Sequence, residues 1–167
     1  NYERMQGMGW THAMLPALEK IYKDDKEGLA NAMKDNSGFI NTNPTAAAFL
    51  MGLIISLDEK KEDRNLINIF KIALFGPLAG IGYALLWFTL LPIVAGICSS
   101  FAQQGNLVGP LVFLIVYIGV FLSRIYLVKI GYDIGSKAID KLKNVSKHVS
   151  KAATILGITV IGGLIAT

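Results

Sequence analysis

A stretch of 52 residues without an acidic or basic side chain constrains this sequence more than any other feature. From Ile72 to Ser123 the chain contains no Asp, Glu, Lys, Arg or His. A helix needs about 20 apolar residues to cross the roughly 30 Å hydrocarbon core of a bilayer, so the stretch has room for two crossings. Its one polar cluster, Gln103–Asn106, is the natural turn between them. The sequence therefore predicts a hairpin of two transmembrane helices, the first within Ile72–Ala102 and the second within Leu107–Ile130.

The composition agrees with a membrane protein. Hydrophobic residues make up 53% of the 167 residues and charged residues only 17%, against about 25% charged residues in soluble domains. The mean hydropathy is +0.48. This apolar content disfavours a freely soluble enzyme and excludes intrinsic disorder. A soluble protein can bury one helix that is apolar all round, but few soluble folds bury two consecutive helices of this length, so the membrane interpretation is favoured.

Positive charge is concentrated after the predicted hairpin. The net charge is +4, and seven Lys and Arg side chains lie between Arg124 and Lys151, opposed there only by Asp133 and Asp140. A basic patch can bind nucleic acid, but one that follows directly on a long apolar run favours a cytoplasmic loop beside the membrane. The lysine-rich segment 137–151 is therefore expected in the cytoplasm and the uncharged turn outside. Residues 1–71 then begin on the cytoplasmic side, and no nucleic-acid partner is expected.

The predicted fold class is all-α: a polytopic membrane protein with two main crossings, a short re-entrant or buried helix and cytoplasmic amphipathic helices. The short helix has an apolar part, Thr45–Leu57, of about 13 residues, which is too short to span a bilayer. Both ends of the chain are expected to be truncated. The predicted segments are 1–35 (amphipathic helices, one capped at Asp24-Asp25), 36–58 (short apolar helix), 59–71 (polar loop), 72–130 (two crossings), 131–151 (basic cytoplasmic segment) and 152–167 (start of a further apolar helix).

No set of side chains forms a recognisable catalytic centre. His12 and His148 share no metal-ligand spacing, and the single Cys98 excludes both an internal disulfide and a thiolate zinc cluster. An intramembrane enzyme would need a buried acid or metal ligand, which the stretch 72–123 does not supply. Arg124 lies near the inner end of the second crossing, where its long side chain is expected to extend toward the headgroups. Neither a cofactor nor a metal is expected.

Polar residues precede the short apolar helix. In Asn41-Thr42-Asn43-Pro44, Asn43 is expected to be the N-cap and Pro44 the first helical residue. Capping does not account for Asn41 and Thr42 beside an apolar segment. A buried amide or hydroxyl needs a partner, and Asn both donates and accepts hydrogen bonds, which suits the hydroxyl groups of a neutral sugar. Asn41 and Thr42 are therefore candidate ligand contacts.

The glycine-rich run Gly76–Gly82 lies inside the first crossing. Gly76 and Gly80 form a GxxxG pair, which most often marks close helix packing. Pro77 removes a backbone donor, and transporters use such broken helices to expose backbone groups at a site in the membrane. Both interpretations, packing and a broken helix, are kept here. A dinucleotide-binding fingerprint is excluded, since the run lacks the third glycine and follows no strand.

Several motifs of this sequence resemble one known family, the mannose-family IID component of the phosphotransferase system. The resemblance covers essentially the whole chain. Its motifs are NYERMQ (1–6), MLPA (14–17), FINTNP (39–44) and GPLAGIG (76–82), followed in order by LWFT (86–89), GPL (109–111), GY (131–132) and ILG (155–157). The first and third are specific together, because neither follows from general membrane composition.

The resemblance implies a subunit of the bacterial inner membrane that pairs with a IIC subunit. Together the two would form the path for a hexose or amino sugar, with the pairs assembled as a trimer. Cytoplasmic IIA and IIB proteins would carry the phosphoryl group on histidines, and the IID subunit would not itself be an enzyme or be phosphorylated. A different class of hypothesis is a degenerate or structural membrane subunit without its own substrate site.

The resemblance also assigns roles to individual residues. The family normally has Asp directly after the GPLAGIG motif, whereas this chain has Tyr83. A phenol can hydrogen-bond to a sugar but does not replace the charge of a carboxylate. The expected substrate contacts are Asn41, Thr42, Gly80, Gly82, Tyr83, Glu3 and Gln6. The expected subunit interface contains Arg4, Gly76 and Pro77.

Overall fold

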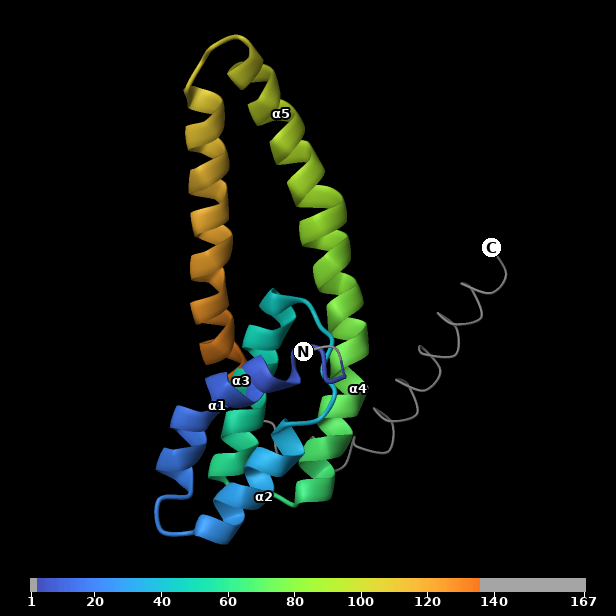
Figure 1. The fold of residues 1–167 in the computed structure, drawn as a ribbon, viewed down its shortest axis with the longest axis vertical. Helices are drawn as coiled ribbons and strands as arrows, with labels where there is room; N and C mark the ends of the chain where they lie inside the picture. Colours follow the sequence, from blue (N-terminus) through green and yellow to red (C-terminus); the bar gives the residue numbers. More distant parts are fainter. Residues whose placement is uncertain (1–2, 136–167) are drawn as a thin grey trace, which may run out of the picture.

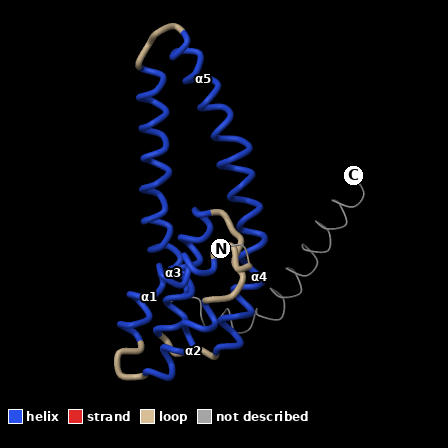
Figure 2. Tube along the Cα trace, viewed as in Figure 1, coloured by secondary structure: helices blue, strands red, loops and turns tan. Residues whose placement is uncertain are grey.

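The computed structural model describes residues 3–135, and every named element in that range is helical (Figures 1 and 2). The predicted segments 137–151 and 152–167 lie outside the described residues. The two long helices form a hairpin, and the shorter α1, α2 and α3 gather at its open end (Figure 1). The elements are α1 Gly7–Ile21, α2 Lys26–Asn36, α3 Pro44–Glu59, α4 Arg64–Gly82, the π-helical η1 Tyr83–Leu90, α5 Leu91–Gln103 and a further helix Val108–Gly135, called here the return helix.

The open end of the hairpin contains one hydrophobic core. We call α1, α2, α3 and the first part of α4 the base. Apolar side chains of the base spaced three and four residues apart face each other, as expected for helices with one apolar stripe. The core contains Trp10, Met14 and Leu18 from α1, Ala32 from α2, Leu50, Leu53, Ile54 and Leu57 from α3, Ile67 and Phe70 from α4, and Tyr22 and Ile40 from the connections.

Two helix starts in the base follow the capping prediction. The Asp25 carboxylate accepts a hydrogen bond from the Gly28 N–H at 2.7 Å. The Asn43 side chain accepts from the Thr45 N–H at 2.9 Å, and Pro44 is the first residue of α3. These side chains satisfy backbone donors that the first turn of a helix leaves free. The capping chemistry therefore fixes where α2 and α3 begin.

The short apolar helix is buried by protein. α3 packs against α4 and α1 and contributes four side chains to the core. The segment predicted to be a polar loop, 59–71, differs from the structure, because only 60–63 connect α3 to α4 and the chain is helical from Arg64 onward. The reason is the apolar pair Ile67 and Phe70, which are both about 1% exposed and lie three residues apart on the face of α4 that meets the core.

The charge-free stretch forms the predicted hairpin. The helix from Arg64 to Gln103 has 40 residues and the return helix has 28, with the turn at 104–107 between them (Figure 1). Gly105 has φ +72, a left-handed conformation that glycine adopts without strain. Almost none of the residues in the most apolar part of either helix are buried. The core helix of a soluble protein is mostly buried. The exposure of the two hairpin helices therefore distinguishes them from such a core helix.

Candidate functional site

The N-terminal segment lies beside the chain that enters α3. Met5 and Ile40 form a β-bridge, the Gln6 N–H donates to the Ile40 carbonyl at 2.9 Å, and the Ile40 N–H donates to the Arg4 carbonyl at 3.4 Å. Residues of the first and third family motifs, more than thirty positions apart in the sequence, therefore meet. Because the bridge is parallel, it places Gln6 beside Asn41, whereas Glu3 lies two residues before the bridge; both Glu3 and Asn41 are exposed.

Thr42 has a structural role at this junction. Its backbone N–H donates to Gln6 Oε1 at 3.0 Å, and its hydroxyl donates to the Phe75 carbonyl at 3.3 Å. The residue is fully buried. Thr42 thus joins the N-terminal segment to α4, next to Gly76, and its hydroxyl is engaged inside the protein.

Asn43 and Gly82 pack directly against each other. A Cβ atom added at Gly82 would lie 2.8 Å from the Asn43 Cβ, closer than real side chains approach. Gly82 therefore allows α4 to pass close to the start of α3. Asn43 is 1% exposed and its Nδ2 has no hydrogen-bond partner among the described residues. Sequence reasoning identified the cap at Asn43 but not this free donor.

The helix break expected at Gly76–Gly82 is not present there. α4 continues as a regular helix through Pro77, and a Cβ at Gly76 or Gly80 would meet no atom of the described chain within 4 Å. The two glycines consequently do not pack against another described helix.

The irregular part of the first long helix follows the glycine run, in η1, which begins at Tyr83. Pro92, just inside α5, has no N–H for the preceding turn, and a lost donor is a known cause of such widened turns. The Thr89 hydroxyl donates to the Ala84 carbonyl, five residues earlier, at 2.8 Å. That bond matches the five-residue spacing of a π-helix.

Two glycines bring the return helix against α3. A Cβ at Gly52 would overlap the Val128 carbonyl oxygen and lie 2.7 Å from the Tyr132 nitrogen. A Cβ at Gly131 would overlap the Phe49 carbonyl oxygen. The backbones of the two helices therefore touch with no side chain between them. This contact sets the height of the return helix relative to the base.

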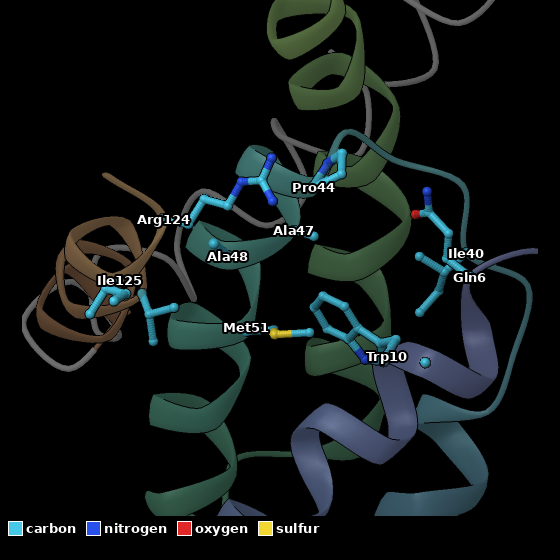
Figure 3. Close-up of a pocket in the computed structure, with 11 residues that line it drawn as sticks. Gln6, Trp10, Ile40, Pro44, Ala47, Ala48, Met51, Arg124 and Ile125 are labelled. Atoms are coloured by element: carbon cyan, nitrogen blue, oxygen red, sulfur yellow. The ribbon is translucent and has the colours of Figure 1, made fainter. Parts of the chain in front are cut away.

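The glycine contact places Arg124 above the start of α3. Arg124 lies about two turns before Gly131 on the return helix, and its guanidinium extends over Ala47 and Ala48 toward Pro44 (Figure 3). Its Nε is buried and has no hydrogen-bond partner among the described residues. Arg124 was expected to extend toward the lipid headgroups; in the structure its half-buried side chain lines two pockets.

The two cavities meet at Arg124 and Pro44. The lower cavity, about 450 Å³, lies between α1, α3 and the return helix, with Gln6 and Arg124 as its polar lining and Trp10, Met51 and Val128 among its apolar lining (Figure 3). The upper cavity, about 190 Å³, lies between the two arms of the hairpin. Its lining includes Asn43, Trp87, Phe113, Tyr117 and Arg124. Asn41 lines neither of these two cavities.

A buried polar network holds the base together. Asp58 is fully buried and accepts hydrogen bonds from the Tyr22 hydroxyl at 3.0 Å and from the Arg64 guanidinium. Arg64 also contacts the Tyr22 hydroxyl and forms an ion pair with Asp35 at 3.7 Å. Burial raises the pKa of Asp58 above its ordinary value, and the attraction of Arg64 only partly offsets this. Burial, followed by the charge of Asp58, raises the pKa of Tyr22.

A second part of the network joins α4 to α1 and α2. The Lys71 ammonium, 7% exposed, donates to the Asp35 carbonyl at 2.6 Å and to Asn36 Oδ1 at 3.2 Å. The Trp10 indole N–H donates to the same Asn36 oxygen at 2.9 Å. These partners satisfy buried donors, so the network stabilises the packing of the four helices.

The remaining candidates for chemistry are separate from the cavities. His12 is exposed on α1, Cys98 is buried against the return helix near Gly109, and His148 lies outside the described residues. Residues 3–135 contain no group of three His, Cys, Asp or Glu side chains that could hold a metal ion.

Comparison with known proteins relates the whole sequence to one family. The family model described as the PTS system mannose/fructose/sorbose family IID component matches residues 1–167. The mannose-specific EIID component of Escherichia coli K12 is 36% identical over 175 residues, which cover 99% of this chain and 61% of that protein. The sorbose-specific EIID component of Lacticaseibacillus casei is 33% identical, with coverage of 99% and 61%.

A solved structure agrees with this relationship. In the cryo-electron microscopy structure of the mannose transporter ManYZ with microcin E492, one chain superposes with a TM-score of 0.89 and 34% identity, over 99% of this chain and 63% of that one. The chain thus spans about three fifths of the length of the relatives it matches. The match over every residue and the shared helical architecture lead to one conclusion: the chain belongs to the mannose/fructose/sorbose family of phosphotransferase-system IID components.

Proposed function

We propose that this chain is the IID membrane subunit of a sugar phosphotransferase system. With a IIC subunit it forms the path by which a hexose or amino sugar enters the cell, and cytoplasmic IIA and IIB proteins supply the phosphoryl group. The subunit is not itself the phosphorylating enzyme. The observation that carries this proposal is the family match over residues 1–167, joined to a hairpin of two exposed apolar helices.

The hairpin is proposed to span the bacterial cytoplasmic membrane with its turn outside and the base at the cytoplasmic side. The turn at 104–107 carries no charge, whereas the described base contains the ion pairs of Arg64 with Asp58 and Asp35 and the exposed charges of α2. The basic segment that follows supports the same orientation, because cytoplasmic loops carry the excess of Lys and Arg.

Sugar contact is assigned to the junction between the N-terminal segment and the chain that enters α3. Asn41, Glu3 and Gln6 offer polar side chains there, and Thr42 holds the two segments together. Gly80, Gly82 and Tyr83 lie on the adjacent long helix, where Gly82 packs against Asn43. Arg4, Gly76 and Pro77 are assigned to the interface with the IIC subunit. Trimeric assembly of the IIC–IID pairs belongs to the same proposal.

The test is sugar uptake coupled to phosphorylation in cells that express the full chain with its IIC, IIA and IIB partners. Asn41→Ala is expected to lower uptake about tenfold, since a lost hydrogen bond to substrate weakens binding by about 1–1.5 kcal/mol. The matched control is Asn31→Ala, which removes an exposed amide from α2, away from the junction. Uptake by Asn41→Ala equal to that of Asn31→Ala would remove Asn41 from the sugar path.

The complex purified from the same cells distinguishes a subunit that takes part in transport from a purely structural one. Sugar that raises the melting temperature of the purified IIC–IID complex supports a substrate path. A complex that assembles but neither transports any sugar nor is stabilised by one would overturn the proposed function, and the chain would then be a structural subunit.

A further inference from the structure

The side-chain amide of Gln6 has a fixed orientation. Its Oε1 accepts a hydrogen bond from the Thr42 N–H at 3.0 Å. A backbone N–H can only donate, so the amide oxygen faces Thr42 and the amide nitrogen faces away from it. Thr42 is itself buried and held in place, because its hydroxyl donates to the Phe75 carbonyl at 3.3 Å. Gln6 therefore presents Nε2, a group that donates hydrogen bonds and accepts none, from a fixed support.

The lower cavity continues the junction to which sugar contact is assigned. Gln6 lines it together with Ile40 and Pro44, which belong to the chain that enters α3 (Figure 3). Gln6 is exposed, so a ligand in the cavity can reach its amide. The volume of about 450 Å³ lies within the range of about 300–1,000 Å³ that is usual for small-molecule sites. A monosaccharide placed there would contact the Gln6 amide directly.

The polar lining of this cavity offers donors and positive charge. Among the described residues that line it, Arg124 carries the one charge, and no Asp or Glu side chain is present. The guanidinium stays protonated at any physiological pH. The indole N–H of Trp10 already donates to Asn36 Oδ1 at 2.9 Å, and the remaining lining, such as Met51, is apolar. A ligand that meets these side chains is expected to bring hydrogen-bond acceptors and no positive charge.

Sugars differ in how they meet these requirements. A sugar hydroxyl accepts a hydrogen bond, whereas the ammonium group of a protonated amino sugar only donates. Inside the cavity that ammonium would lose water without gaining an acceptor from Gln6, and Arg124 would repel it. We propose that the lower cavity selects uncharged sugars and rejects a sugar that carries a protonated amine. This inference rests on the sugar path of the proposed function and narrows its substrate class.

The test compares uptake of three sugar pairs by cells that express the full chain with its IIC, IIA and IIB partners. The pairs are glucose with glucosamine, mannose with mannosamine, and galactose with galactosamine, and within each pair only the group on C2 differs. In the pair that is transported best, the KM of the amino sugar is expected to be about tenfold or more above that of the hexose. The ratio is expected to fall when the external pH is raised above the pKa of the amine, because the charge is then lost.

The variant Gln6→Glu tests the role of the amide. It keeps the side-chain length and the acceptor for the Thr42 N–H, but an acceptor with negative charge replaces Nε2. The KM ratio of amino sugar to hexose is expected to fall about tenfold, because the ammonium gains a partner. A purely structural role of Gln6 would change both KM values equally. Gln104→Glu is the matched control: it makes the same substitution at an exposed amide in the outer turn and is expected to keep the ratio of the parent.

The outcomes separate this inference from the proposed function. Equal KM values for hexose and amino sugar in the parent, or a lower value for the amino sugar, would overturn the selection and leave the sugar path standing. An unchanged ratio in a Gln6→Glu protein that still co-purifies with the IIC subunit would overturn the role of the amide. If that variant does not assemble, the ratio of the parent and its pH dependence decide the question. Failure of the parent to take up any sugar would overturn both proposals.

Discussion

The base and the hairpin use the same kinds of residue in opposite ways. In the base, large apolar side chains such as Leu50, Leu57 and Phe70 are 0–1% exposed, and the buried charges have partners on neighbouring helices. In the hairpin, Phe88 is 77% exposed and Ile115 66%, and charged side chains are absent from the stretch 72–123. The base is thus closed within one chain, whereas no described residue covers the apolar surface of the hairpin.

The largest expected effect is in the polar network of the base. Arg64→Met would leave the fully buried Asp58 without its cation, and an uncompensated buried charge costs about 3–5 kcal/mol of stability. The measurement is the thermal unfolding midpoint of the full protein in detergent. Adding Asp58→Asn to Arg64→Met is expected to restore much of the loss. A single variant as stable as the parent would show that the base does not depend on this pair.

A pair of leucines tests the comparison directly. Leu50→Ala in the base opens a cavity in a closed core and is expected to cost about 2–5 kcal/mol. Leu114→Ala on the return helix, where the side chain is 56% exposed, is expected to change the stability of the detergent-solubilised chain by less than about 1 kcal/mol. Equal losses at the two positions would mean that the hairpin has a closed core of its own.

The glycine contact is where the two regions join. Gly131→Ala would push a Cβ into the Phe49 carbonyl and is expected to cost about 1–3 kcal/mol through displacement of the return helix. Gly119→Ala, on the same helix where a Cβ meets no described atom, is the control. Cysteine cross-linking between the return helix and α3 reports the displacement. Unchanged cross-linking in Gly131→Ala would show that the joint tolerates separation.

The smallest expected effect is on pH dependence. Because the folded protein raises the pKa of Asp58 above its ordinary 3.8, the fold favours the protonated form. This contribution to stability is complete below the ordinary value and is lost as the pH rises through the raised one. Unfolding midpoints between about pH 4 and pH 7 are therefore expected to fall more with pH in the parent than in Asp58→Asn, which does not titrate. Parallel curves would contradict the pKa shift.

The features that could be predicted from the sequence are those determined by residues close together in the chain. The absence of charge over 72–123 located the hairpin and its turn, and local side-chain chemistry located the caps at Asp25 and Asn43. The network around Asp58 was missed because Tyr22 and Asp58 are separated by 36 residues, and a cluster of charges in sequence looks the same whether it is solvated or buried. The start of α4 within 59–71 was missed for a different reason, because the helical spacing of Ile67 and Phe70 was not recognised among the neighbouring charges.

The candidate site was predicted only in part. The family motifs suggested Glu3 and Gln6 as members of the site of Asn41 and Thr42 or of the subunit interface, and the structure joins Gln6 to Thr42 by a hydrogen bond. Arg124 was noticed as the first charge after the apolar stretch, but its direction depends on the crossing at Gly52 and Gly131. Glycines inside apolar runs have several meanings, so that crossing has no specific signal in the sequence.

The π-helical turns of η1 affect the direction in which the surface of α5 faces. Each residue added to or removed from a helix rotates everything beyond it by about 100°. η1 lies between the part of the first long helix that packs on the base and α5, which carries Cys98 against the return helix. A single-residue deletion within η1 would return the spacing to that of an α-helix and swing the α5 surface around its axis. The length of η1 thus sets which side of α5 faces the return helix and which side faces away from it.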